Sequence, residues 1–241
     1  MSKFTIIGDI HGRTNWNQII EKESDSDKFI FLGDYFDPYE HYSSEHLIKN
    51  FMDILDLKTK LPDKVILLIG NHDLSYIHHS ATQCRFSYNV FKEIQAKMYN
   101  LIEDDTFKLC YFISDNIVCS HAGFSKTWLE ENNLTLNEKL LNDTFKQDLL
   151  DGNIYKYDFI FRKFNQSGYG DDVWQSPLWI RPYSLTINSP SDISQIVGHT
   201  QNNWQTNIHL MKVTLCDSLA WDKYYILTIL DDEINFNMKT V

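Results

Sequence analysis

Short apolar runs that end in polar turns recur along the chain. The runs open the stretches FTIIGDIHGR at 4–13, KFIFLGDYFDP at 28–38, KVILLIGNHD at 64–73 and IVCSHAGF at 117–124. Their residues are mostly β-branched, leucine or phenylalanine, without polar alternation, which is typical of strands that are buried on both faces. We therefore expect buried strands at 4–7, 29–32, 65–69 and 117–120.

Helical periodicity separates these strands. Apolar residues recur at intervals of three or four in two sets: Leu47, Ile48, Phe51, Met52 and Leu55, then Phe91, Ile94, Met98 and Leu101. The first set follows Ser43 and Ser44, either of which is a suitable N-cap, and it ends before Pro62. The other expected helices are 14–23 and a segment that runs from a Thr135–Glu138 capping box to about residue 150.

The second half of the chain is expected to be richer in strands joined by short turns. Residues 107–113 and 117–120 are predicted to pair as neighbouring strands. Further strands are expected at 193–197, 208–215 and 225–230. Alternating strands and helices, followed by strands alone, indicate α/β layers and then a second, more antiparallel sheet.

No linker, repeat or low-complexity tract divides the chain, so we expect a single domain over residues 1–241. One stretch, at about 151–192, differs because aromatic residues crowd into it without clear periodicity. Such an aromatic excursion can cover one edge of the core or form a wall of the substrate pocket. The sequence leaves both alternatives open.

Composition and charge narrow the class of protein. Of the 241 residues 43% are hydrophobic, and 22 basic against 33 acidic residues give a formal net charge of −11. This charge opposes loose, charge-driven binding to nucleic acid or to anionic membranes. No apolar run approaches the ~20 residues that span a bilayer, and no leader precedes the first strand, so we expect a cytoplasmic protein. The four cysteines have no C-x-x-C spacing and are expected to be buried, reduced thiols.

Groups that can bind a metal follow the apolar runs. They are Asp9 and His11, Asp34 and Asp37, Asn71, His72 and Asp73, His121, and, after a run at 193–197, His199. Ligands bind outside the carboxyl ends of the strands in α/β sheets. Oxygen and imidazole groups without thiolates suit Mn²⁺, Fe or Zn²⁺, and their number exceeds what one ion needs. We expect a pair of ions that share one carboxylate, although such residues are also common in ordinary turns.

The motifs GDIHG, GDYFDP, GNHD, SHAG and VGHT, in this order, resemble those of the calcineurin-like metallophosphoesterases, among them bacterial and phage serine/threonine-type phosphatases and diadenosine tetraphosphatases. The resemblance extends from residue 4 to about residue 217. It implies an α/β fold of two facing mixed β-sheets flanked by helices, an α/β/β/α sandwich with the metals at one end.

The resemblance also implies roles for individual residues. Asp9 and His11 would bind the first of two divalent ions, and Asp34 would bridge both ions. The second ion would be bound by Asn71, His121 and His199. Mn²⁺ is the expected metal, with Fe and Zn²⁺ as alternatives. A hydroxide that bridges the ions would attack phosphorus directly.

The same resemblance implies an acid for the leaving group. His72 would protonate the leaving oxygen, and Asp37 would orient its ring. The chain departs from the family pattern at Pro38, where the family carries an arginine that holds phosphate. Arg181 in SPLWIRP is the expected substitute, and Arg13 and Arg162 are weaker candidates.

A phosphatase acting on phosphomonoesters is the leading hypothesis, with a phosphoprotein, a nucleotide or a nucleic-acid end as substrate. A diadenosine-polyphosphate hydrolase is the nearest alternative. A phosphodiesterase or nuclease is disfavoured by the net acidity and by Gln201, which stands where such relatives carry a second histidine. A non-catalytic scaffold is disfavoured because the ligands and the acid histidine are all present.

Overall fold

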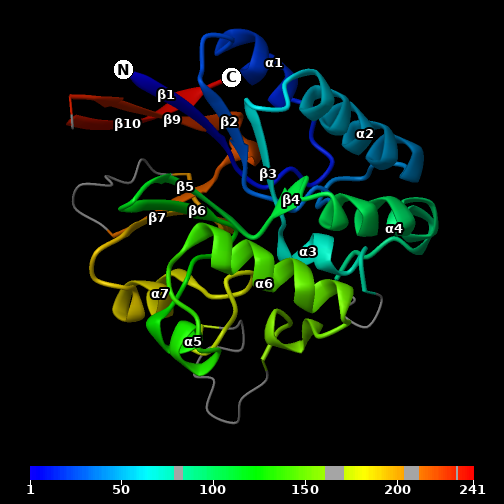
Figure 1. Cartoon of the computed structure of the whole chain (residues 1–241). Helices are drawn as coiled ribbons and strands as arrows, with labels where there is room; N and C mark the ends of the chain where they lie inside the picture. The colour runs from blue at the N-terminus through cyan, green and yellow to red at the C-terminus, as the bar shows by residue number, and fades with distance from the viewer. Residues whose placement is uncertain (79–83, 161–170, 204–211, 232) are drawn as a thin grey trace.

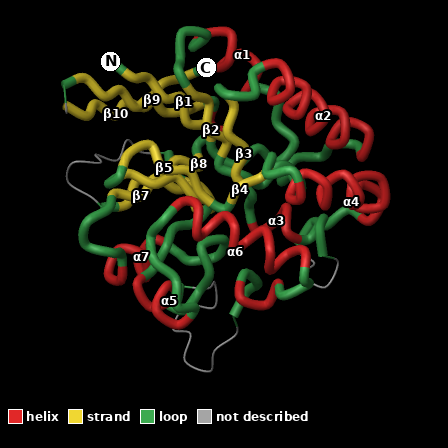
Figure 2. Tube along the Cα trace, in the orientation of Figure 1, coloured by secondary structure: helices red, strands yellow, loops and turns green. Residues whose placement is uncertain are grey.

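Two β-sheets face each other, and helices lie on the outer side of each (Figures 1 and 2). This computed structural model describes residues 1–78, 84–160, 171–203, 212–231 and 233–241. The helices α1 (Trp16–Lys22), α2 (Ser44–Lys60) and α4 (Tyr88–Glu103) lie on one side of the sandwich, and α5 (Lys126–Glu131), α6 (Glu138–Leu150) and α7 (Pro182–Asn188) lie on the other. This architecture confirms the expected fold class.

The first sheet has the strand order β10-β9-β1-β2-β3-β4. Its strands are β1 (Ser2–Ile7), β2 (Lys28–Phe31), β3 (Val65–Leu68), β4 (Phe107–Lys108), β9 (Lys223–Leu230) and β10 (Glu233–Thr240). The strands β1 to β4 are parallel, and their register places Ile6 beside Ile30 and Ile30 beside Ile66. The carboxyl ends of β1, β2 and β3 therefore meet at one edge of the sheet.

The second sheet has the order β5-β6-β7-β8. Its strands are β5 (Cys110–Ser114), β6 (Ile117–Ser120), β7 (Ser194–Gln201) and β8 (Val213–Asp217). Only β5 is antiparallel to its neighbour, since β6, β7 and β8 run parallel. The expectation of a more antiparallel second sheet was therefore wrong. The predicted strand at 225–230 lies instead in the first sheet, as β9, and supplies that sheet's antiparallel pairs.

The expected strand at 107–113 is divided between the two sheets, because β4 belongs to the first and β5 to the second. Asn142 fixes the crossing point. Its Oδ1 accepts the backbone N–H groups of Leu109 (2.9 Å) and Cys110 (3.2 Å), and its amide donates to the Cys110 carbonyl (3.0 Å). One side chain on α6 thus satisfies the backbone groups that leave the first sheet.

The N-cap residues of α2 and α6 can be compared with the predicted starts of these helices. Ser43 caps α2, where its Oγ accepts the N–H of His46 at 3.2 Å. The expected capping box at Thr135 and Glu138 was wrong, because Asn137 caps α6. The Glu138 carboxylate accepts the N–H of Phe112 at 2.8 Å, so it is held by β5 rather than by its own helix.

Side chains on the central strands alternate between two cores, which explains their unbroken apolar character. Ile30 and Ile66 face the second sheet, whereas Phe31 and Leu67 face the helices. From the second sheet, Ile117 and its neighbours close the core between the sheets. Polar residues begin only where these strands end, and there they gather. The chain has two further short elements near this end, α3 (Asn71–Leu74) and a 3-10 turn at Leu219–Trp221.

Candidate metal centre

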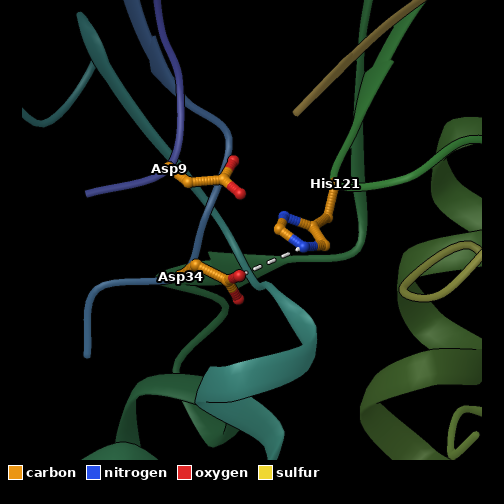
Figure 3. A group of neighbouring side chains, drawn as sticks. All are labelled: Asp9, Asp34 and His121. Atoms are coloured by element: carbon orange, nitrogen blue, oxygen red, sulfur yellow. Dashed lines mark ion pairs between the residues drawn. The ribbon is translucent and has the colours of Figure 1, made fainter. Parts of the chain in front are cut away.

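Three buried side chains from three strand ends form the centre of the site. Asp9 follows β1, Asp34 follows β2 and His121 follows β6, so both sheets contribute. Each offers a ligand atom within 4.8 Å of the other two. Figure 3 shows the two carboxylates pointing toward the imidazole of His121. Only the facing of the two sheets brings residues so distant in the chain together.

Backbone carbonyls orient two imidazoles toward Asp34. The Nδ1 of His11 is 2.7 Å from the carbonyl oxygen of Phe36, and the Nδ1 of His121 is 2.8 Å from that of Leu32. A carbonyl can only accept, so both rings donate from Nδ1. Each Nε2 then presents its lone pair to Asp34 Oδ2, at 3.6 Å from His11 and 3.5 Å from His121.

The side-chain oxygen of Asn71 lies close to two imidazole nitrogens. Its Oδ1 is 2.9 Å from His121 Nε2 and 3.0 Å from His199 Nδ1. His199 donates from its other nitrogen, Nε2, to the carbonyl of Trp179 at 3.2 Å. With these tautomers, three lone pairs converge on one point without a proton between them. A cation satisfies such an arrangement, so the donor set fits a divalent metal.

The pKa values favour neutral imidazoles at this place. Burial lowers the pKa of His11 to about 4, although the neighbouring Asp34 opposes the shift. Burial also lowers the pKa of His121, and it holds the pKa of His199 well below its usual range, where Arg181 acts in the same direction. Neutral imidazole is the form that binds metals.

The carboxylates repel one another in the absence of a cation. Burial raises the pKa of Asp9, and the nearby Asp217 and Asp34 raise it further. Burial raises the pKa of Asp217 to about 7, although Arg13 lowers it. Asp217 Oδ1 is buried and has no hydrogen-bond partner among the described residues. The sequence prediction missed Asp217, which follows the apolar run at 213–216 as the other site residues follow theirs.

Asp73 fixes the loops that carry the ligands. Its carboxylate accepts the backbone N–H groups of Asp34, Tyr35 and Gly70, each at 2.8 Å. Three such bonds to one carboxylate join the turn after β2 to the start of α3, which carries Asn71. Asp73 was expected among the groups that can bind a metal, and its carboxylate is instead bonded to the backbone.

The turns at Gly33 and Gly70 touch, and a side chain at either position would separate them. A Cβ added at Gly70 would overlap the carboxylate and backbone nitrogen of Asp34. We therefore expect Gly70→Ala to destabilise the protein by about 1–3 kcal/mol, the usual cost of overpacking, and to reduce metal binding. Thermal unfolding and elemental analysis measure the two effects.

Gly152→Ala is the matched control for this substitution. Gly152 has a φ of +77°, and an added Cβ would meet only a ring carbon of His78 at 3.9 Å. This variant should lose some stability through backbone strain but keep its metal. Normal metal content in Gly70→Ala would contradict the proposed tight contact.

The predicted general acid, His72, and its partner Asp37 lie beside Asp34. His72 Nδ1 is 2.8 Å from Asp37 Oδ2, and the other oxygen of Asp37 accepts the hydroxyl of Tyr76. The backbone N–H of His72 donates to Asp34 Oδ1 at 2.9 Å. The ring centroids of His72 and His11 are 5.3 Å apart. The structure thus brings His72 and Asp37 to the ligands, with Tyr76 as a further partner that the sequence did not reveal.

A cavity of about 430 Å³ opens above these groups. Besides the residues already described, its wall contains Tyr39, Cys84, Arg85, Trp179, Arg181 and Gln201. Cys110, Cys119 and Cys216 are buried as expected, but Cys84 is exposed, because it lies in a loop at the cavity rather than in a strand.

The candidate arginines differ in their surroundings. Arg181 lines the cavity, and its Nη1 donates to the carbonyl of His199 (3.2 Å) and to Thr200 Oγ1 (3.1 Å). Arg13 is buried, and the Glu40 carboxylate accepts hydrogen bonds from its Nε and Nη2. Its guanidinium therefore stabilises the loop that carries Glu40. Arg162 lies outside the described residues.

The aromatic excursion combines both predicted uses. Tyr157 is fully buried in the core, and its hydroxyl donates a hydrogen bond to Asp148 Oδ2. Trp179 instead lines the cavity, and its ring centroid is 5.8 Å from that of His199. Residues 161–170 of the excursion lie outside the described part of the chain.

Known proteins resemble this chain in sequence. A family model described as calcineurin-like phosphoesterase matches residues 2–217. The PP2A-like serine/threonine-protein phosphatase PPG1 of Saccharomyces cerevisiae is 27% identical over 156 residues, which are 61% of this chain and 39% of that protein. The serine/threonine-protein phosphatase ppe1 of Schizosaccharomyces pombe is 31% identical over 132 residues, 50% of this chain and 39% of its own length. The chain thus spans well under half of these curated relatives.

Solved structures share the fold at low sequence identity. A mutant of a cold-active protein tyrosine phosphatase has a TM-score of 0.61 and 16% identity, and the match covers 100% of this chain and 80% of that one. A protein serine/threonine phosphatase from Saccharomyces cerevisiae has a TM-score of 0.51 and 14% identity, with the same coverage of 100% and 80%. Among the described residues, no helix is long and apolar enough to cross a membrane.

Proposed function

Because the chain belongs to the calcineurin-like phosphoesterase family, we propose that it is a metal-dependent phosphatase that hydrolyses phosphomonoesters at the centre described above. The observation that carries this proposal is the convergence of lone pairs from Asn71, His121 and His199 beside the His72–Asp37 pair. A cation site next to a positioned acid is what hydrolysis of a phosphoric ester needs.

Two divalent ions would be held by this donor set. Asp9 and His11 would bind one ion, and Asp34 would be shared. The other ion would be bound by Asn71, His121 and His199. Mn²⁺ is the metal we propose, with Fe and Zn²⁺ as alternatives, because the ligands are oxygens and imidazoles. Ions bound there would activate water as the nucleophile and would neutralise charge that develops on the phosphoryl group.

His72 would deliver the proton that the leaving oxygen needs. Its Nδ1 is held by Asp37, so the transferable proton would be carried on Nε2. Tyr76 donates to the other oxygen of Asp37 and thereby fixes the carboxylate. Asp37 would both orient the ring and stabilise its protonated form, in the way a buried carboxylate supports a catalytic histidine.

Arg181 would bind oxygens of the phosphoryl group. It lines the cavity, and its bonds to His199 and Thr200 hold the guanidinium near the second ligand set. Arg181→Ala should lower kcat/KM by about 10–100-fold and weaken inhibition by inorganic phosphate, because a charge-assisted pair is lost. Steady-state kinetics on p-nitrophenyl phosphate measures both. Unchanged phosphate inhibition with normal metal content would remove Arg181 from substrate binding.

The proposed substrate class is a phosphoprotein, since the curated relatives above are named serine/threonine-protein phosphatases. Gln201 in the cavity wall provides no second imidazole for diester chemistry. The test is a panel of a phosphopeptide, a mononucleotide, a phosphorylated nucleic-acid end, diadenosine tetraphosphate and a phosphodiester, each with the Mn²⁺-loaded protein. Fastest turnover of diadenosine tetraphosphate would favour the alternative hydrolase, and turnover of none would favour a scaffold. We further propose a cytoplasmic location.

A further inference from the structure

The cavity wall contains a second arginine, Arg85, which is bonded to the backbone of Asp37, the partner of His72. We propose that Arg85 is a substrate-binding residue whose guanidinium binds a non-bridging oxygen of the phosphoryl group, opposite Arg181. This inference rests on the proposed function, and it deepens it by assigning a two-arginine site for a phosphate dianion. Arg85 was not selected from the sequence, because this residue follows neither an apolar run nor a motif.

Three contacts hold the Arg85 side chain, one of them from its Nη1 to the Sγ of the neighbouring Cys84 at 3.4 Å. Its Nε donates to the backbone carbonyl of Asp37 at 2.9 Å. Its guanidinium carbon lies 3.8 Å from the centre of the Tyr39 ring, a cation–π distance. An exposed arginine is usually free to sample many rotamers, and these three contacts restrict Arg85. A restricted guanidinium loses less entropy when it binds an anion.

The Arg85 guanidinium has no ion-pair partner in the described part of the chain. Among the described residues, no carboxylate lies within ion-pair distance of its guanidinium, whereas Arg13 is paired with Glu40. The chain is acidic, with a formal net charge of −11, and Asp9 and Asp34 line the same cavity. Arg85 is nevertheless not paired with a carboxylate among the described residues, so its guanidinium can bind an anionic ligand. The ligand that fits a guanidinium next to a metal centre is an anion with several oxygens.

The positions of the two arginines point to one anion between them. Arg85 is bonded to the residue that orients His72, and Arg181 is bonded to the carbonyl of His199. The phenol ring of Tyr39 lies under Arg85, and Tyr39, Arg85 and Arg181 all line the same cavity. Pro38, next to Tyr39, offers no cation itself. Arg85 contacts Asp37 and Tyr39, the residues on either side of Pro38, from a different loop.

Two guanidinium groups favour a dianion over a monoanion. A phosphomonoester presents two charges and three non-bridging oxygens, whereas a phosphodiester presents one charge and two. Removal of Arg85 should therefore weaken binding of monoesters and inorganic phosphate more than binding of diesters. The preference of the protein for phosphomonoesters over phosphodiesters should therefore decrease when Arg85 is removed.

The experiment compares Arg85→Ala, Arg85→Lys and wild type, all loaded with Mn²⁺. Binding of inorganic phosphate is measured by calorimetry, and kcat and KM are measured on p-nitrophenyl phosphate and on bis(p-nitrophenyl) phosphate. Arg85→Ala should bind phosphate about 10–100-fold more weakly and should show most of its loss in KM. Arg85→Lys should recover part of the affinity, because it keeps the charge but not the planar fork.

Lys92→Ala is the matched control. Lys92 also stacks on an aromatic ring, with its Nζ 4.5 Å from the centre of the Tyr88 ring, but it is not in the cavity wall. It should bind phosphate as wild type does. Metal content and thermal stability are compared in all variants, and both should stay close to those of wild type.

Two results would overturn the assignment. Wild-type phosphate affinity in Arg85→Ala is one. The other is a fall in kcat with no change in phosphate affinity, which would mean that Arg85 acts only by positioning Asp37. Failure of the proposed function would give a different result. Wild-type protein would then bind phosphate but hydrolyse none of the esters. Calorimetry on Arg85→Ala would still show whether Arg85 binds phosphate.

Discussion

Asp34→Asn should reduce turnover by about 10³-fold or more and should lower the metal content of the purified protein. Asp34 is the carboxylate that faces both ligand sets, with Oδ2 at 3.5–3.6 Å from the Nε2 atoms of His11 and His121. Loss of its charge weakens both proposed ion sites, and each ion contributes several kcal/mol to catalysis. The measurements are kcat on p-nitrophenyl phosphate at saturating Mn²⁺ and metal content by elemental analysis.

Asp105→Asn is the matched control for this experiment. Asp34 and Asp105 both have left-handed backbone conformations, with φ of 53° and 60°, which asparagine tolerates well. Asp105 is not one of the residues that line the cavity, and it pairs with Lys146. It should keep full activity and metal. Near-normal turnover in Asp34→Asn at saturating Mn²⁺ would refute the shared-ligand assignment.

His72→Asn should lose activity in a way that depends on the leaving group. A general acid contributes typically ~10²–10⁴-fold when the leaving oxygen needs a proton. An alkoxide needs one, whereas a nitrophenolate hardly does. The variant should therefore lose much of its kcat on alkyl phosphates and far less on p-nitrophenyl phosphate. Its metal content should stay close to normal, because His72 is not a proposed ligand.

Two neighbours of His72 refine the test. Asp37→Asn should show a milder form of the same selectivity, since it disturbs the bond to Nδ1 but leaves the ring in place. Tyr76→Phe should be milder still, because it removes only the hydroxyl that Asp37 accepts. An equal loss on both substrate types, or a loss of metal in His72→Asn, would show that His72 is a ligand or a binding residue instead.

The sequence predicted what depends on local pattern. The strands β1, β2, β3 and β6 were expected because both of their faces are buried, which leaves unbroken apolar runs. Asp9, Asp34 and His121 were expected near one another because each follows a predicted buried strand. The strands and the residues that follow them are encoded within a few residues of the chain, whereas the facing of the two sheets that brings the three side chains together is not.

The sequence did not predict what depends on distant partners. The strand β9 was expected, but its place beside β1 in the first sheet was not, and β10 was missed because only Phe236 on it is buried. Asn137 rather than Thr135 caps α6, since Glu138 is drawn to β5. Asp73 binds backbone N–H groups, which any residue type provides, so no sequence pattern indicates its partners.

The place of β9 has a consequence for how the protein is made. Ribosomal synthesis delivers the last proposed ligand, His199, before it delivers β9 at Lys223–Leu230. Until then β1 has an open edge on the side where β9 later pairs, and Tyr225 and Leu227 are missing from the core between the sheets. A nascent chain therefore holds every ligand while its first sheet is still incomplete. Because β1 pairs with β9 across more than 200 residues of sequence, we expect the first sheet to be completed late and the fold to form slowly.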